Sequence, residues 1–187
     1  MVYGYRNRVT GVFQKKTRIS STATITDKSQ LDIGDGCWVW HHSIIDSSNG
    51  IKIGEGCQIG AWVGIFTHSS HIAIRLLGRE YINAARHERI GYTREPVEIG
   101  EYTFIAASSL ILPGVKVGKG CLIAAGSVLS KSVPDFSLVS GNPAKIIGRT
   151  TSLDSKFFKD PLVQKLYFDQ GIVEDYLNKK TKICSES

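Results

Sequence analysis

Long hydrophobic runs are missing from this sequence. No apolar stretch approaches the roughly 20 residues that are needed to span a bilayer. The first residues, MVYGYRNRVTG, carry charges without the apolar segment of a signal peptide. We therefore expect a cytoplasmic protein that does not insert into a membrane.

Closely spaced cysteines are missing as well. The sequence predicts neither a zinc site nor a disulfide framework, because no CxxC pair is formed by its four cysteines, Cys37, Cys57, Cys121 and Cys184. Reduced thiols of this kind agree with a cytoplasmic compartment.

A surplus of acidic residues is also missing, because the formal net charge is +6. Such a charge fits nucleic acid, an acidic polymer or a phosphorylated small molecule, and it equally fits lysines that are simply solvated. No basic patch interleaved with aromatic residues favours nucleic acid. We expect no nucleic-acid partner.

What the sequence does contain is a six-residue repeat. From residue 99 onwards it divides into blocks that each begin with an aliphatic residue: IGEYTF, IAASSL, ILPGVK, VGKGCL, IAAGSV and LSKSVP. The same rhythm runs from Ile33 to Ile65 with one shift of frame, which we assign to the extra residues Ile51 and Lys52. Earlier aliphatic residues continue it at the same spacing: Ile19, Ile25 and Leu31.

A period of six fits neither an ordinary sheet nor a helix, but it fits short parallel strands joined at the corners of a triangular coil. The first residue of each block then points inwards. The second is often glycine, as a tight corner requires. The fifth is small or medium in size, and we interpret Cys37, Cys57 and Cys121 there as interior fillers rather than reactive thiols.

These blocks, the stretch GKGCLIAAGSVLSKSVP and the closing VSGNPAKIIG resemble the hexapeptide-repeat acyltransferases that use acetyl-CoA. The resemblance covers roughly residues 19–149 and implies an all-β fold, a left-handed parallel β-helix of about five coils. The handedness rests on the resemblance alone, because crossovers between parallel strands are usually right-handed. We expect a lead-in over residues 1–18, the β-helix domain over 19–149 and a helical tail over 150–187.

The repeat is interrupted over residues 67–98, where His68 and His71 arrive together. A neutral imidazole at the coil edge can act as a general base. In the family the base is a histidine on the loop after such a coil, and His68, which follows Thr67, matches that placement better than His71. His71 remains the alternative base, or a residue that contacts the substrate or forms a hydrogen bond within the loop.

The resemblance also implies where acetyl-CoA binds, which is between neighbouring subunits of a homotrimer along the C-terminal coils. Small residues on the coil face would admit the pantetheine arm, and cations would meet the phosphates. Phe104 departs from the tryptophan of many relatives. The residues that we expect to contact acetyl-CoA are Ala106, Ala107, Ala124, Ala125, Ser130, Lys131, Lys145 and Arg149.

The interrupting loop is rich in arginine and tyrosine, which suit carboxylates, phosphates and sugar faces. A long loop that needs charge to stay soluble explains the same composition. The candidate acceptor-binding residues are Arg75, Arg79, Tyr81 and Tyr92, with His42 from an earlier coil. His87 lies in a charged stretch and is expected to be solvated.

After the coils, Asp160 and Pro161 are typical of the start of a helix, and Gly171 is typical of its end. Its apolar face is expected to cover the open last coil or a neighbouring subunit. The face would consist of Leu162, Val163, Leu166 and Tyr167.

The sequence thus favours a homotrimeric enzyme that moves acetyl from acetyl-CoA to a sugar hydroxyl, without a metal. The resemblance points to bacterial surface polysaccharides, such as capsule or O-antigen. Two alternatives stay open: an N-acetyltransferase acting on an amino group of a nucleotide-linked sugar, and a non-catalytic trimeric scaffold. A zinc enzyme resembling the β-helix carbonic anhydrases is disfavoured, because no histidine pair has the HxxxxH spacing of that class.

Overall fold

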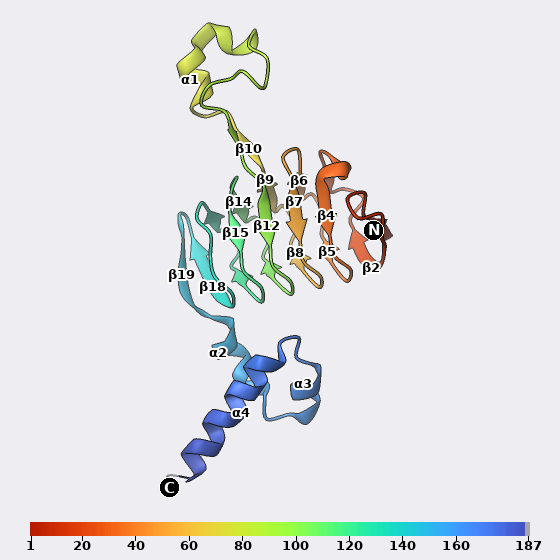
Figure 1. Cartoon of the computed structure of the whole chain (residues 1–187), viewed down its shortest axis with the longest axis vertical. Coiled ribbons are helices and arrows are strands. Elements are labelled where there is room, and N and C mark those ends of the chain that lie inside the picture. The colour runs from red at the N-terminus through yellow and green to blue at the C-terminus, as the bar shows by residue number, and fades with distance from the viewer. Residues whose placement is uncertain (186–187) are drawn as a thin grey trace.

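The aliphatic residues of the repeat lie on short strands that stack into three sheets. A computed structural model describes residues 1–185 (Figure 1). Sheet A runs in the order β1 (Val2–Arg6), β2 (Phe13–Ile19), β5 (Trp38–Val39), β8 (Gln58–Ile59), β13 (Phe104–Ile105), β16 (Leu122–Ile123), β18 (Ser137–Gly141) and β19 (Ala144–Arg149). Sheet B is ordered β17 (Val128–Leu129), β14 (Leu110–Ile111), β9 (Gly64–Phe66), β6 (Ile44–Asp46) and β3 (Thr24–Ile25). Sheet C is ordered β15 (Lys116–Val117), β12 (Val97–Ile99), β7 (Ile51–Ile53) and β4 (Leu31–Ile33).

The chain visits the sheets in turn, for example β5 in sheet A, β6 in sheet B, β7 in sheet C and then β8 in sheet A again. Successive strands within a sheet pair in parallel, whereas the hairpins β1–β2 and β18–β19 at the two ends are antiparallel. This arrangement is a parallel β-helix, as the period of six predicts.

The interior of the coil is filled as predicted. The first residue of each block is buried, including Ile33, Ile65 and Ile123 with no exposed surface. The three cysteines at the fifth block position are also buried and free: Cys37, Cys57 and Cys121. The side chain of Cys184 lies outside the described part of the chain.

The register of the coils departs from the predicted frame. Ile25, Ile45 and Ile65 stack on one another at intervals of 20 residues, whereas Ile111 stacks on Leu129 at an interval of 18. The N-terminal coils are therefore longer, and the frame shifts twice rather than once. Leu31, predicted to begin a block, lies in β4 just before the true block start at Ile33.

Glycine at the second block position is explained by close approach of the next coil, not by an unusual φ. A Cβ atom added to Gly100 would lie 2.4 Å from the backbone nitrogen of Lys119, and one added to Gly118 would lie 2.3 Å from that of Asp135. The backbones of adjacent coils meet at this corner with no room for a methyl group.

Replacing Gly100 by alanine is therefore expected to destabilise the fold by roughly 1–3 kcal/mol, the usual cost of overpacking. Urea unfolding followed by circular dichroism measures the change. Gly171→Ala is the matched control. Gly171 lies in a helix, and a Cβ atom added to it would lie 3.3 Å from Oδ1 of Asp169, its nearest neighbour. We expect no loss of stability in this variant. Equal midpoints for Gly100→Ala and wild type would contradict the packing argument.

The segment that interrupts the repeat leaves the coil as a two-stranded ribbon, β10 (His68–Ser69) and β11 (Thr93–Arg94). Beyond the ribbon lie α1 (Ala73–Leu77) and the 3₁₀ helix η2 (Gly78–Ile82), which project away from the stacked sheets (Figure 1). The predicted loop ended too late, because Val97 is buried in β12. Its apolar side chain completes the strand in sheet C.

The C-terminal segment holds α2 (Thr150–Asp154), the 3₁₀ helix η3 (Ser155–Phe157), α3 (Pro161–Leu166) and α4 (Gln170–Ser185). One more 3₁₀ helix, η1 (Lys28–Gln30), lies between β3 and β4. The predicted cap is confirmed, because Asp160 accepts a hydrogen bond from the backbone N–H of Leu162 at 2.8 Å. Among the described helices, none is both long and apolar enough to cross a bilayer.

Two expectations about this segment are wrong. Gly171 does not end the helix, because it lies inside α4. The predicted apolar face does not cover the coil of its own chain either, since Leu162 and Leu166 are 61% and 69% exposed. That it covers a neighbouring subunit stays a prediction. The backbone turns extended at Tyr167 and delivers Phe168 onto the coil instead, where its ring stacks on Tyr102 at 4.6 Å.

Candidate active site

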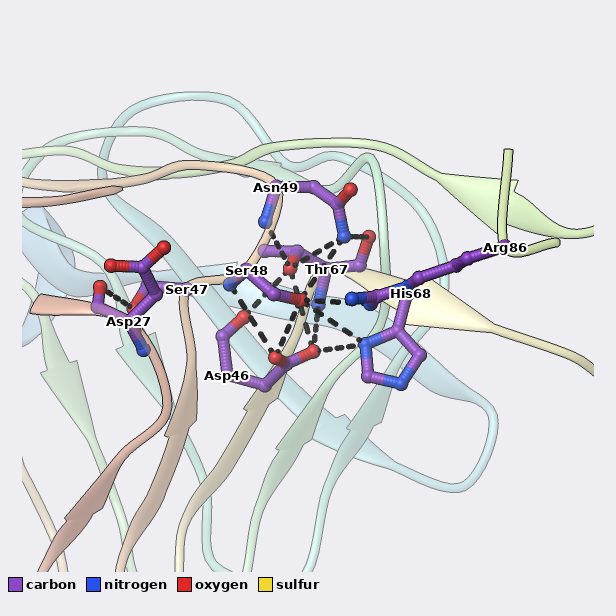
Figure 2. Close-up of polar contacts among 8 residues, drawn as sticks. All are labelled: Asp27, Asp46, Ser47, Ser48, Asn49, Thr67, His68 and Arg86. Carbon is purple, nitrogen blue, oxygen red and sulfur yellow. Dashed lines mark hydrogen bonds and ion pairs between the residues drawn. The ribbon is translucent and has the colours of Figure 1, made fainter. Parts of the chain in front are cut away.

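A histidine and a carboxylate from adjacent coils meet just beyond the C-terminal ends of two strands of sheet B, β6 and β9. Asp46 ends β6 and pairs with Phe66 at the end of β9, so that His68, two residues further on, lies beside it. The Nδ1 atom of His68 is 2.5 Å from Oδ2 of Asp46 (Figure 2). The Asp46 side chain is 5% exposed and that of His68 is 36% exposed.

The carboxylate of Asp46 is held by neighbouring hydrogen-bond donors. Ser48 Oγ donates to Oδ1 at 2.8 Å, and the backbone N–H of Thr67 donates to Oδ2 at 3.2 Å. Burial by itself raises the pKa of Asp46, but these hydrogen bonds and the neighbouring His68 outweigh it and hold the pKa below its ordinary value. The group is thus an ionised acceptor at neutral pH.

This network determines which nitrogen of His68 carries the proton. An ionised carboxylate has no proton to donate, so Nδ1 of His68 must be the donor in their hydrogen bond. Ser48 Oγ also lies 3.4 Å from Nδ1, but its single proton already goes to Asp46. In the neutral imidazole, Nε2 is therefore unprotonated and can accept a proton.

Two residues of the projecting segment reach the surroundings of His68. Tyr92 stacks on His68 with 5.8 Å between ring centroids and an angle of 5° between planes. Arg86 reaches back from beyond the ribbon towards Ser48, with 3.5 Å between Nη2 and Oγ (Figure 2). The segment that breaks the repeat therefore takes part in the geometry around His68.

His68 opens into a cavity of about 560 Å³ at the end of sheet B. Both predicted histidines and one predicted coenzyme residue, Ser130, line it together. His71 differs from His68 because its Nδ1 meets only a hydroxyl, Ser69 Oγ at 2.7 Å, and its side chain is exposed. Of the two histidines that line the cavity, His68 alone is paired with a carboxylate in the described part of the chain.

The four predicted alanines lie together but not in this cavity. Ala106, Ala107, Ala124 and Ala125 stack at the corner between sheets A and B, where the N–H of Gly126 donates to the carbonyl of Ala107 at 3.0 Å. The corner lies at the start of β9, since the N–H of Ser108 donates to the carbonyl of Ala61. His68 lies beyond the other end of the same strand.

The predicted cations do not form one cluster. In the β18–β19 hairpin Lys145 lies opposite Ser140, near the alanine corner, whereas Arg149 lies opposite Ser137 at the far end of the hairpin. Arg149 lines a separate cavity of about 380 Å³ against Tyr176 and Asp175 of α4. Lys131 is exposed and directly follows Ser130. Within one chain these cations therefore lie apart, and their contact with the coenzyme phosphates stays a prediction.

The predicted acceptor residues are also divided. Tyr92 contacts His68, but Tyr81 packs far along the projecting segment against Arg89, whose guanidinium lies 4.2 Å from its ring centroid. Arg75 bonds to the carbonyl of His71, and Arg79 is exposed on η2.

His42 stacks on Trp62 at 6.0 Å, at the alanine corner rather than beside His68. The predicted solvation of His87 is confirmed, because its side chain is 82% exposed.

Asp46 is the site residue that reasoning from the sequence missed. Its block, IDSSNG, has an acidic residue where other blocks have glycine, and that departure was the available signal. It was obscured because the longer coil places Asp46 beside a histidine 22 residues later. No group of three potential metal ligands occurs among residues whose placement is described.

Comparisons with known proteins identify relatives that share the repeat. The family described as hexapeptide repeat of succinyl-transferase matches residues 30–65, and the family described as bacterial transferase hexapeptide matches residues 96–131. A Saccharomyces cerevisiae protein that bears an acetyltransferase name is 35% identical over 68% of this chain and 60% of its own length. Serine acetyltransferase 4 of Arabidopsis thaliana is 30% identical over 72% of this chain but only 34% of its own length.

Solved structures show the same fold. A hexapeptide-repeat acetyltransferase from Vibrio cholerae, in complex with acetyl-CoA, superimposes with a TM-score of 0.61 at 24% identity, covering 72% of this chain and 68% of that one. A maltose O-acetyltransferase from Clostridium difficile gives a TM-score of 0.61 at 23% identity, covering 72% and 67%. The repeats and these neighbours imply a left-handed parallel β-helix, and the chain belongs to the hexapeptide-repeat acyltransferases.

Proposed function

We propose that this chain transfers acetyl from acetyl-CoA to a hydroxyl group of a sugar, with His68 as the general base. The observation that carries the proposal is the pairing of His68 with the buried carboxylate of Asp46 at the mouth of a cavity that Ser130 also lines. The likeness to a maltose O-acetyltransferase and to a galactoside acetyltransferase in complex with coenzyme A supports acetyl-CoA as the donor and a sugar as the acceptor.

In this reaction Nε2 of His68 removes the proton of the acceptor hydroxyl as its oxygen attacks the thioester carbonyl. The tetrahedral intermediate then collapses, the C–S bond breaks, and the coenzyme A thiolate takes up the proton held by His68. Asp46 keeps Nδ1 as the donor and stabilises the imidazolium that forms between the two steps. Neither step calls for a metal ion.

The separation of the alanine corner from His68 supports a homotrimer. Coenzyme A that lies along the alanine corner of one subunit would meet the His68 cavity of a neighbouring subunit, because the two features lie at opposite ends of β9 in a single chain. Lys145 at the alanine corner would then face the cofactor. Ser130 and Lys131 would approach it from the His68 side.

The acceptor is proposed to be a sugar of a bacterial surface polysaccharide or its precursor. N-acetylation of a nucleotide-linked amino sugar is the second candidate, favoured by the likeness to a Bacillus cereus N-acyltransferase solved with coenzyme A and a dTDP-linked amino sugar, at a TM-score of 0.56 and 19% identity. Mild alkali separates the two, because it releases acetate from an ester but not from an amide.

Thiol release from acetyl-CoA in the presence of a panel of sugars and nucleotide-sugars tests the proposal. We expect release that depends on both substrates, together with an acetylated product. A protein that binds no coenzyme A and releases no thiol with any acceptor would instead be a scaffold.

Tyr92 offers a test of how the projecting segment supports the base. Tyr92→Ala removes the ring that stacks on His68 and is expected to lower kcat by roughly threefold to tenfold, the worth of one aromatic pair. Tyr92→Phe keeps the stack and should retain the wild-type rate, as steady-state kinetics would measure. An equal loss in both variants would show that the hydroxyl, rather than the stack, matters.

A further inference from the structure

Four of the five arginines in the projecting segment fall into two groups with different surroundings. Arg75 is satisfied by the carbonyl of His71, and Arg89 by the carbonyl of Ala84 and the hydroxyl of Tyr81. Arg86 and Arg94 instead gather at the candidate site, where their guanidinium carbons lie 5.8 and 4.8 Å from the ring centroid of Tyr92. Composition alone could not separate these groups.

Arg94 lacks an acceptor for part of its guanidinium. Its Nη2 atom is buried without a hydrogen-bond partner, and it forms no ion pair with any described residue. Packing on Tyr92 satisfies the face of the guanidinium but leaves the N–H groups at its edge unpaired. A buried cationic donor of this kind is costly unless an acceptor completes it.

Arg86 is nearly as poorly compensated. Its one hydrogen bond in the described part of the chain is the 3.5 Å contact to Ser48, a neutral hydroxyl. The guanidinium groups of Arg86 and Arg94 thus pack on the same tyrosine, neither forms an ion pair with a described carboxylate, and their like charges repel each other. Asp46, the carboxylate of the site, is already occupied by His68, Ser48 and Thr67.

The position of this pair relates it to the reaction. Arg94 is directly opposite His68 in the β10–β11 ribbon, and Tyr92 stacks on the His68 ring. The neighbouring Thr93 lines the same cavity as His68. An anion bound by Arg94 and Arg86 would therefore belong to a molecule whose hydroxyl can reach Nε2.

We propose that Arg86 and Arg94 form a subsite for an anionic group, a carboxylate or a phosphate, on the acceptor. This inference rests on the proposed acetyl transfer and adds to it the class of acceptor, which is a negatively charged sugar rather than a neutral one. Guanidinium groups bind either anion through paired N–H donors.

The experiment compares glucose derivatives that carry a hydroxyl, a carboxylate or a phosphate group at C6. Methyl glucoside, methyl glucuronoside and glucose 6-phosphate are tested with wild type, Arg86→Gln, Arg94→Gln and Arg94→Lys, and both KM and kcat are measured. Binding of the same three compounds is measured by calorimetry without acetyl-CoA. Arg8→Gln, which alters an exposed arginine in the turn between β1 and β2, is the matched control.

Wild type should bind at least one anionic sugar roughly 10- to 100-fold more tightly than the neutral glucoside, the range for hydrogen bonds to a charged group. Arg94→Gln and Arg86→Gln should remove that preference by raising KM for the anionic sugar alone, while Arg94→Lys restores part of it. Whichever anion is preferred identifies a carboxylate or a phosphate subsite.

Several results would overturn the subsite. Equal binding of neutral and anionic sugars, or an equal loss for both in Arg94→Gln, would leave the arginines with a packing role only. A rise confined to the KM of acetyl-CoA would assign them to the coenzyme phosphates. If wild type transfers no acetyl, the proposed function fails, but the calorimetry still decides whether the subsite exists.

Discussion

His68→Ala is expected to lower acetyl transfer by about 10²- to 10⁴-fold, the usual contribution of a general base. The loss should appear in kcat, because the imidazole accepts a proton in the transition state and does not bind the cofactor. We expect a large loss of activity because, among the described residues, only His68 both lines the cavity and contacts a buried carboxylate. Stopped assays of the acetylated product at several acceptor concentrations, with free thiol measured in parallel, give kcat and KM.

Two matched variants control this experiment. His87→Ala removes a histidine whose side chain is 82% exposed and should behave as wild type. His71→Ala alters the rim of the same cavity, and a loss below about tenfold is expected because its ring meets a serine rather than an acid. Coenzyme A binding should persist in all three variants. A collapse in His71→Ala with activity retained in His68→Ala would move the base to His71.

The coil itself was predictable because its rule is local. A block such as IGEYTF needs an aliphatic residue where the strand faces the interior, and Ile99 is buried accordingly. The same holds for Cys37 and Cys57, whose size suits the recurring interior position. The type of each of these residues indicates whether its side chain faces the interior, so the period of six was sufficient to predict a parallel β-helix.

Features that depend on two coils at once were not predictable in the same way. The length of the N-terminal coils appears only when Ile45 is seen stacked on Ile65. That length decides which acid meets His68, and Asp46 was therefore overlooked. The helix α3 ends early because Phe168 packs on Tyr102, a partner more than sixty residues away in the chain. Long-range contacts override local signals such as Gly171.

Asp46→Asn is the second variant with a large expected effect, a loss in kcat of roughly 10²-fold or more. An amide can donate to His68 as well as accept from it, so it no longer forces the proton onto Nδ1. The ring can then adopt the tautomer in which Nε2 is protonated and unable to act as a base. Ser48→Ala is the matched control, because it removes a neighbouring hydroxyl but leaves the carboxylate and its contact with His68 in place.

A positioning role for Asp46 makes a further demand that a purely structural role does not. If Asp46 acts only through His68, the double variant Asp46→Asn/His68→Ala should be no slower than His68→Ala, because the carboxylate has nothing left to orient. The pH dependence of kcat should also shift in Asp46→Asn, since the charge that stabilises the imidazolium is gone. Losses that multiply in the double variant, or a pH profile that does not change, would mean that Asp46 supports the coil rather than the base.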